Sequence, residues 1–145
     1  MFKKILVAVD GSTFADHAVD CAADIAKKFD AKIDIIHAIT RPTYVEDITM
    51  GLHGDKIEEI GWKILKKSSQ RVGTIGLKPE LRLVKGHPAR EIAKIVNKEK
   101  YDLLVIGSRG LGSVKALLIG SISEKLSKLA KCTVIIVRPR NTTQK

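Results

Sequence analysis

Five short apolar runs rich in isoleucine and valine recur along the chain, and they restrict its fold more than any other feature. They span residues 5–9, 33–38, 81–84, 103–106 and 134–137. Three of the runs are continuous rather than alternating, which is typical of strands that other elements cover on both faces. We therefore predict five strands within a layered domain.

The segments between these runs carry apolar residues every three or four positions, as amphipathic helices do. The residues predicted to face the sheet are Phe14, Ala18, Ala22, Ile25 and Phe29, then Ile57, Ile60, Ile64, Val72 and Ile75, then Ala89, Ile92, Ala93 and Val96, and last Ile122, Leu126 and Leu129. Pro88 suits the first position of the third helix. Because strands and helices alternate, we predict an α/β fold with a parallel sheet and helices on both faces.

Length and composition indicate one domain. A chain of 145 residues with 44% hydrophobic residues can bury a core without disulfides. Cys21 and Cys132 lack C-x-x-C spacing, so we expect two buried thiols and no zinc site. No apolar run approaches the roughly 18 residues of a membrane span or forms a signal-peptide core, so we expect a cytoplasmic protein without membrane contact.

The net charge of +10 is unevenly distributed. Residues 1–72 carry 11 Lys and Arg against 11 Asp and Glu, whereas residues 73–145 carry 15 against 5. A basic half attracts nucleotide phosphates, nucleic acid or acidic partners, although lysines such as Lys94 and Lys125 also fit a solvated helix face. Aromatic residues make up only 4% of the chain, which argues against nucleic acid as a partner bound by base stacking.

A glycine-rich segment follows the fourth run. Residues 107–110 read Gly-Ser-Arg-Gly, and nine residues later 120–123 read Gly-Ser-Ile-Ser at the start of the last predicted helix. Ligands of open parallel sheets bind beyond the carboxyl ends of the strands. Glycines let backbone N–H groups approach a phosphate, or supply the positive φ angles of an anion-binding nest, and a helix start favours negative charge. We predict a phosphate site here.

Each part of this segment also has a purely structural explanation. A glycine after a strand is commonly a turn residue, and the segment from Ser121 to Glu124 fits a helix capping box that needs no ligand. The role of the long irregular segment 40–54 is also left undecided by the sequence, because the segment fits a surface flap, a lid or a dimer contact. His37 lies on an apolar run, where we expect a hydrogen-bonded core histidine, and none of the histidines is paired at metal-ligand spacing.

The spacing of Gly107, Gly110, Gly120 and Ser121 matches G-x2-G-x9-G-[ST], and with it the chain closely resembles the ATP-binding branch of the universal stress protein family. The opening KKILVAVDGS and the later VIIVRP are similar to the family as well. The resemblance implies one family domain over 1–139 with a polar tail at 140–145. It also implies a Rossmann-like, three-layer fold, the strand order 3-2-1-4-5 and a homodimer joined through the last strand.

The resemblance further implies where ATP would bind, with any Mg2+ held by the phosphates. Asp10 is expected at the base or ribose edge, unless it serves only the turn before the first helix. Arg109 is expected to reach the terminal phosphates, unless it faces solvent. The complete expected set is Ala8, Val9, Asp10, Ala38, Gly107, Ser108, Arg109, Gly110, Gly120, Ser121, Ile122 and Ser123. Ala38 stands where the family often has valine against adenine.

Two functions fit this expected site. The first is a nucleotide-dependent regulatory module of the stress response, which acts through its dimer on partners that the sequence does not identify. The second is a slow ATPase or phosphotransferase. Hydrolysis needs a counter-charge, which Arg109 offers, and a group that orients water, for which the sequence offers no convincing residue. The G-x4-G-K-[ST] motif is also absent from the sequence, so binding is favoured over catalysis.

Overall fold

Strands and helices alternate along the whole described chain. The computed structural model describes residues 1–40, 54–111 and 119–139. In order, the elements are β1 (Lys4–Ala8), α1 (Thr13–Phe29), β2 (Lys32–Ile39), α3 (Gly54–Gly73), β3 (Glu80–Lys85), α4 (Pro88–Lys98), β4 (Leu103–Gly107), α5 (Ser121–Leu129) and β5 (Thr133–Val137). Each predicted apolar run therefore forms a strand.

The strands form one parallel sheet in the order β3-β2-β1-β4-β5. This order confirms the α/β fold with strand order 3-2-1-4-5. The central strand β1 pairs with β2 on one side and with β4 on the other, so that Val7 lies opposite both Ile35 and Val105. The connections leave β1 and β4 toward different halves of the sheet, and such a switch point is where ligands of this fold class bind.

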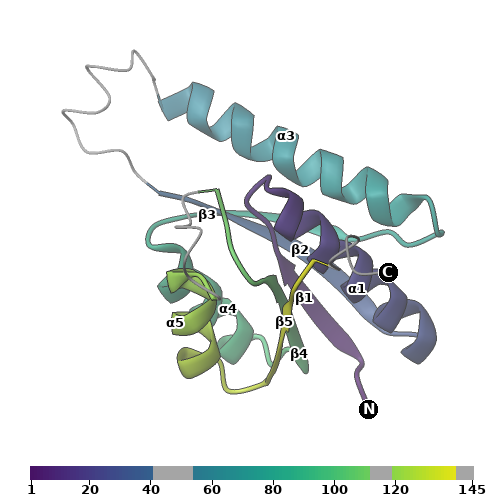
Figure 1. Cartoon of the computed structure of the whole chain (residues 1–145). Helices are drawn as coiled ribbons and strands as arrows, with labels where there is room; N and C mark the ends of the chain where they lie inside the picture. The colour runs from purple at the N-terminus through teal and green to yellow at the C-terminus, as the bar shows by residue number, and fades with distance from the viewer. Residues whose placement is uncertain (41–53, 112–118, 140–145) are drawn as a thin grey trace, which may run out of the picture.

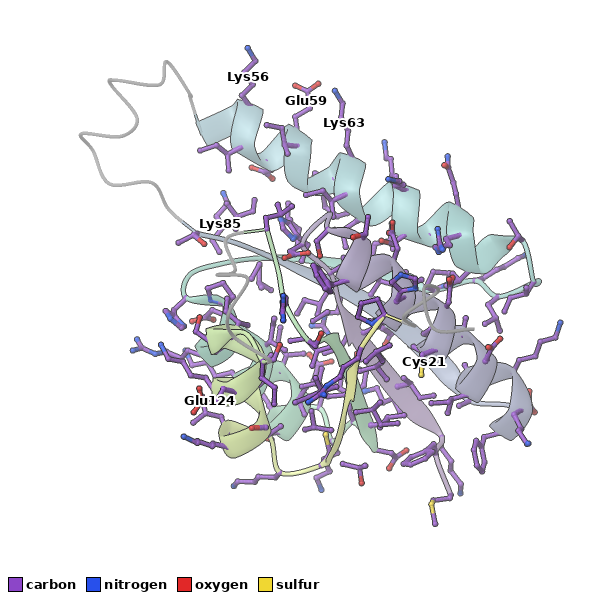
Figure 2. All side chains as sticks on the ribbon, in the orientation of Figure 1. Cys21, Lys56, Glu59, Lys63, Lys85 and Glu124 are labelled. Atoms are coloured by element: carbon purple, nitrogen blue, oxygen red, sulfur yellow. The ribbon has the colours of Figure 1, made fainter. Side chains whose placement is uncertain are left out.

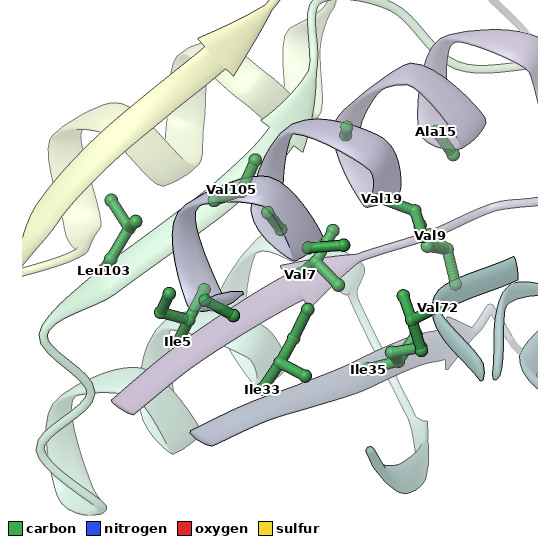
Figure 3. Close-up of a cluster of buried hydrophobic side chains, with 14 of the residues drawn as sticks. Ile5, Val7, Val9, Ala15, Val19, Ile33, Ile35, Val72, Leu103 and Val105 are labelled. Atoms are coloured by element: carbon green, nitrogen blue, oxygen red, sulfur yellow. The ribbon is translucent and has the colours of Figure 1, made fainter. Parts of the chain in front are cut away.

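Helices cover both faces of the sheet and complete three layers (Figure 1). α1 and α3 pack on one face, and α4 and α5 pack on the other. Along β1 the side chains alternate, because Ile5 and Val7 enter the core beneath α1, while Leu6 and Ala8 enter the core beneath α4 and α5. Figure 3 shows the first of these cores, with Val19 of α1 above the strands.

The start and end of α1 follow from its sequence. The side chain of Ser12 caps the helix by accepting the backbone N–H of Ala15 at 3.2 Å. Asp30 ends it in the left-handed conformation, with φ of 52°. The residues that face the sheet include the alanines Ala15, Ala18, Ala22, Ala23 and Ala26. Their small side chains let the helix lie close to β1 and β4.

The predicted inward stripes are wrong at several large residues. Ile60 of α3 is 48% exposed, and Leu129 of α5 is 49% exposed. The buried positions of α3 are Val72, as predicted, and Gly61, Leu65 and Ser68, which the predicted stripe did not include. A Cβ on Gly61 would lie 2.8 Å from Leu83 Cδ1, so the helix approaches β3 closely at that glycine. The close approach turns the neighbouring isoleucine outward, which hydrophobicity alone does not reveal.

The cysteines also differ from expectation. Cys21 and Cys132 are free thiols, as predicted, but both are only partly buried. Burial is the main cause that raises the pKa of each thiol, and the nearby carboxylate of Asp24 adds to the effect at Cys21. Over the ranges that the structure describes, no helix has the length and apolar character needed to cross a bilayer.

Polar side chains connect neighbouring strands near the end of the sheet where the strands begin. The hydroxyl of Tyr101 donates to Oδ2 of Asp34 at 2.7 Å, and that aspartate is only 1% exposed. Arg82 forms an ion pair with Glu99, with 2.7 Å between Nη2 and Oε1, and this partner lowers the pKa of the glutamate. Lys4 Nζ lies 4.3 Å from the centre of the Tyr101 ring. Burial, followed by the bond to Asp34, raises the tyrosine pKa.

Candidate functional site

A cavity of about 490 Å³ opens at the other end of the sheet, where β1, β2 and β4 finish. Its volume lies within the usual range of small-molecule pockets. The structure brings to its wall eleven of the residues that the sequence predicted: Ala8, Val9, Asp10, Ala38, Gly107, Arg109, Gly110, Gly120, Ser121, Ile122 and Ser123. The twelfth, Ser108, is 3% exposed and lies outside the lining.

One part of the cavity is apolar. Ala8, Ala38 and Ile106 come from three neighbouring strands, and Pro88 and Ile92 come from the first turns of α4. The sequence analysis missed the residues from α4. They could have been found from topology, because every helix that follows a strand in a parallel sheet starts at the same edge. Ala15, His37, Thr40 and Leu111 also line the cavity and were missed.

Asp10 connects the end of β1 to the glycine segment after β4. Its Oδ1 accepts the backbone N–H of Ser12 at 2.9 Å, which is the turn role considered from the sequence. Its Oδ2 accepts the backbone N–H of Leu111 at 3.1 Å. The same carboxylate therefore orders the start of α1 and holds the glycine segment in place, while its half-buried side chain lines the cavity.

The glycines of the segment are needed for close packing. A Cβ on Gly107 would lie 2.9 Å from the backbone carbonyl of Phe14, so a side chain there would push α1 away from β4. A Cβ on Gly110 would collide with Oδ2 of Asp10. Neither glycine has a positive φ, and Gly120 does not either. Of the two roles considered for Gly107 and Gly110, the nest with positive φ angles is therefore wrong.

The two glycine-containing segments lie side by side. The N–H of Gly120 donates to the carbonyl of Ser108 at 2.6 Å, and the N–H of Ser108 donates to the carbonyl of Val137 at 2.9 Å. These bonds connect the start of α5, the end of β4 and the last residue of β5. Ser108 thus contributes through its backbone, which explains its burial outside the cavity wall.

α5 begins at the cavity without a side-chain cap. Gly120 is the N-cap residue, and no side chain accepts from the first turn. The capping box considered for Ser121 and Glu124 does not form, because Gly120 rather than Ser121 is the N-cap, and Oε1 of Glu124 instead lies 3.3 Å from Lys128 Nζ. The first amides of a helix have no acceptor within it, so this helix start offers N–H groups and a positive dipole end to the cavity.

The two serines of this helix start differ in their surroundings. Ser121 is exposed at the cavity wall. Ser123 is 3% exposed, and its hydroxyl donates to the carbonyl of Gly107 at 2.7 Å. The hydroxyl hydrogen of Ser123 is therefore used within the protein, whereas the Ser121 side chain makes no hydrogen bond to another described residue.

The cavity holds one cationic side chain among its described lining residues, that of Arg109. It forms no ion pair with the part of the chain that the structure describes. His37 is half-buried, and its Nδ1 lies 2.7 Å from the carbonyl oxygen of Val9, so that Nδ1 carries the hydrogen. The hydrogen bond was expected from the sequence, but the ring lines the cavity and is not fully buried in the core. Within 1–40, 54–111 and 119–139, no three His, Cys, Asp or Glu side chains gather to hold a metal.

Comparison with known proteins decides the family. The profile of the Universal stress protein family matches residues 1–138. The chain belongs to this family. The universal stress protein YxiE of Bacillus subtilis (strain 168) is 33% identical over 148 residues, which cover 95% of this chain and 100% of the relative.

Solved structures of universal stress proteins share the fold. UspA from Lactobacillus plantarum superposes with a TM-score of 0.83 at 24% identity, over 94% of this chain and 98% of the other. A universal stress protein solved in complex with cAMP gives a TM-score of 0.74 at 26% identity, over 94% of this chain and 97% of the other. Of the segments predicted to be irregular, 41–53 and 140–145 lie outside the described residues.

Proposed function

We propose that this universal stress protein binds an adenine nucleotide, with ATP as its ligand, and acts as a nucleotide-dependent regulatory module. The observation that carries the proposal is the composition of one cavity. Its apolar wall leads to an uncapped helix start and to a cation that has no ion-pair partner among the described residues. A related universal stress protein was solved in complex with cAMP, which supports the class of ligand.

The apolar wall suits the base. Ala8, Ala38 and Ile106 form a surface of small and aliphatic side chains, against which a flat purine would bury its faces. Ala38 is smaller than the valine expected from the family resemblance, so the base would have more room on that side. The carboxylate of Asp10, whose oxygens each already accept one N–H, retains lone pairs for a ribose hydroxyl.

The part of the cavity wall formed by the start of α5 and by Arg109 suits phosphates. The first amides of α5 and the hydroxyl of Ser121 are hydrogen-bond donors, and Arg109 adds a full positive charge. A chain of three phosphates would use more of these groups than a single phosphate. Mg2+ would be held by phosphate oxygens and water, because it is commonly bound that way.

The site is connected to an edge of the sheet through hydrogen bonds. β5 is an edge strand, and its residues Val134 to Val137 stay partly exposed in one copy of the chain. Such an edge presents unpaired backbone groups for pairing with a second chain. Because the N–H of Ser108 binds the carbonyl of Val137, a ligand that moves the glycine segment would also move this edge. We therefore propose that a homodimer would form through β5.

Hydrolysis is the weaker candidate for the same cavity. Asp10 is the carboxylate in the described wall, and both of its oxygens accept backbone N–H groups. A carboxylate engaged in this way has less freedom to orient an attacking water. Arg109 would still supply a counter-charge for the transition state. The rate of ATP hydrolysis should therefore be measured alongside the affinity for ATP.

Calorimetric titration with ATP, AMP and cAMP, with and without Mg2+, tests the proposal. We expect ATP to bind roughly tenfold or more tightly than AMP, and Arg109→Gln to remove most of that difference, because a charge-assisted hydrogen bond is worth about that factor. Absence of binding by all three nucleotides would refute the site. Phosphate release followed over hours, in the same samples, separates a binding module from an ATPase.

A further inference from the structure

Cationic side chains gather on the outer surface of the layer formed by α4 and α5. The five exposed cations are Arg90, Lys94, Lys98, Lys125 and Lys128. Together with the half-exposed Leu129, these residues are called the α4–α5 face below. The two helices carry only two acidic residues, Glu91 and Glu124. On the opposite face of the sheet, α1 and α3 carry seven Lys and Arg against six Asp and Glu, so the net charge is +1 for these two helices and +3 for α4 and α5.

The helical pitch places the α4 cations on the side next to α5. The buried residues Ala89, Ala93 and Val96 define the inward direction, and at about 100° per residue the three cations of α4 point roughly 100–190° away from it. Asn97 lies on the same flank. Its Nδ2 donates to the carbonyl of Leu129 at 3.0 Å, which shows that this flank faces the end of α5.

The α5 cations lie on the flank that faces α4. The buried Leu126 defines the inward direction of α5. Around the helix axis, Lys125 lies roughly 100° and Lys128 roughly 160° from that direction, and both lie on the same side as Leu129. Leu129 is the residue whose carbonyl α4 contacts. Both helices begin at the cavity, so they run side by side in the same direction, and their cations border one seam.

Most of this charge is not neutralised within the protein. Lys94 and Lys128 form ion pairs within their own helices, with Glu91 at 3.7 Å and Glu124 at 3.3 Å, and both lysine side chains are largely exposed. Figure 2 shows Glu124 on the outer side of α5. Ion pairs between exposed side chains such as these contribute little free energy, so they hold the two lysines only weakly. The cations Arg90, Lys98 and Lys125 form no ion pair in the described ranges.

Leu129 decides which anionic partner fits. It is 49% exposed beside Lys125 and Lys128, and an apolar side chain among cations gives a phosphate backbone nothing to contact. An amphipathic helix uses both features, since carboxylates recur at its i and i+4 positions about 6 Å apart, and an apolar residue can lie between them. We propose that the α4–α5 face docks an acidic, amphipathic segment of a protein partner.

The test uses the full chain and a fluorescein-labelled synthetic helix with glutamates on one face around a central leucine. Fluorescence anisotropy gives its affinity at low and at physiological salt. The triple variant Lys94→Gln, Lys98→Gln and Lys125→Gln is expected to bind the peptide roughly tenfold more weakly. Each of the three lysines would lose one exposed ion pair with the peptide, and the three small losses in binding free energy add up to about that factor. The matched control removes three exposed lysines of α3, as Lys56→Gln, Lys66→Gln and Lys67→Gln, and is expected to keep the affinity.

Further comparisons separate this proposal from simple charge attraction. Leu129→Ser is expected to weaken peptide binding roughly threefold without changing its salt dependence, because it removes apolar contact and no charge. A peptide of the same composition with scrambled order is expected to bind more weakly. Equal losses in both triple variants, equal affinity for the scrambled peptide, or tighter binding of a short DNA duplex than of the peptide would overturn the proposal. Thermal unfolding checks that every variant is folded.

Discussion

The carboxylate of Asp10 accepts the backbone N–H of Leu111 at 3.1 Å, which joins two positions that are 101 residues apart in the sequence. This bond spans the gap between β1 and the segment after β4, at the switch point of the sheet. It depends on Gly110, because no side chain fits between that backbone and the carboxylate. The shape of the cavity and the bond between Asp10 and Leu111 are therefore linked.

Gly110→Ala is expected to weaken ATP binding roughly tenfold or more while the fold is retained. The new Cβ would displace the Asp10 carboxylate and break its bond to Leu111, at a cost of about 1 kcal/mol in stability. Calorimetric titration measures the affinity, and urea unfolding measures the stability.

Gly73→Ala is the matched control, because a Cβ at the end of α3 would meet no atom within 4 Å. It is expected to leave ATP binding unchanged and to raise stability by about 0.5 kcal/mol, since alanine loses less backbone entropy in a helix than glycine does. Equal effects of the two substitutions on affinity would show that the contact with Asp10 does not shape the site.

The two serines at the start of α5 are expected to separate stability from binding. Ser123→Ala removes a buried hydrogen bond to the carbonyl of Gly107 and should lower the free energy of unfolding by about 1–2 kcal/mol. Ser121→Ala removes an exposed hydroxyl and should leave stability within about 0.5 kcal/mol.

Affinity measurements complete this comparison. Ser121→Ala is expected to weaken ATP binding roughly fivefold, because its hydroxyl is available to a phosphate oxygen. If Ser121→Ala destabilised the protein as much as Ser123→Ala, the assignment of their separate roles would be wrong.

Tyr101→Phe is expected to lower the free energy of unfolding by about 1–3 kcal/mol. The substitution leaves Oδ2 of Asp34, a buried carboxylate oxygen, without the hydroxyl that donates to it. Urea unfolding followed by circular dichroism measures the change. Ser127→Ala, which removes an exposed hydroxyl bonded to the carbonyl of Glu124, serves as the control and should cost little. ATP affinity should be the same in both variants, because Tyr101 lies outside the cavity wall.

Glu99→Gln is expected to change how stability depends on pH. The ion pair with Arg82 lowers the pKa of Glu99 in the folded protein, so its stabilising effect is present at neutral pH. The effect is lost as the pH falls through about 4.3, the ordinary glutamate pKa, and on toward the lower pKa of the folded state. The difference in stability between wild type and variant should therefore shrink in acid.

Urea unfolding between neutral pH and pH values below the ordinary glutamate range measures this difference. Glu124→Gln removes the same charge from a more exposed pair with Lys128, and its effect on stability should be smaller at neutral pH. A difference between wild type and Glu99→Gln that stayed constant with pH would contradict the role assigned to the ion pair.

The strands could be predicted from the sequence because each is a short, mostly apolar run, and those of β1, β2 and β4 are buried on both faces of the sheet. The helix faces were harder to predict. Gly61 packs against Leu83, which turns Ile60 outward, and no hydrophobicity pattern shows that a glycine will be buried. The sequence also identified most of the residues around the cavity, since the glycine motif marks the end of β4 and the start of α5, and the family resemblance implied the residues at the ends of β1 and β2.

The roles of individual site residues could not be predicted in the same way. A side chain at position 110 would collide with Asp10, which is distant in sequence, and a side chain at position 107 would collide with the backbone of Phe14. Glycine is required at both positions for these reasons. Such requirements arise only when three-dimensional contacts are known. The same is true of Pro88 and Ile92, which become part of the cavity because α4 starts at the edge where β1 ends.

The bond between Tyr101 and Asp34 and the ion pair between Arg82 and Glu99 lie at the end of the sheet opposite the cavity. These two polar contacts are thus remote from the residues that would choose a ligand. Substitutions of exposed cavity residues such as Leu111 or Ser121 would leave both of these contacts in place. A chain built in this way is a suitable starting point for engineering pockets with new small-molecule preferences, and divergent evolution could exploit the same separation.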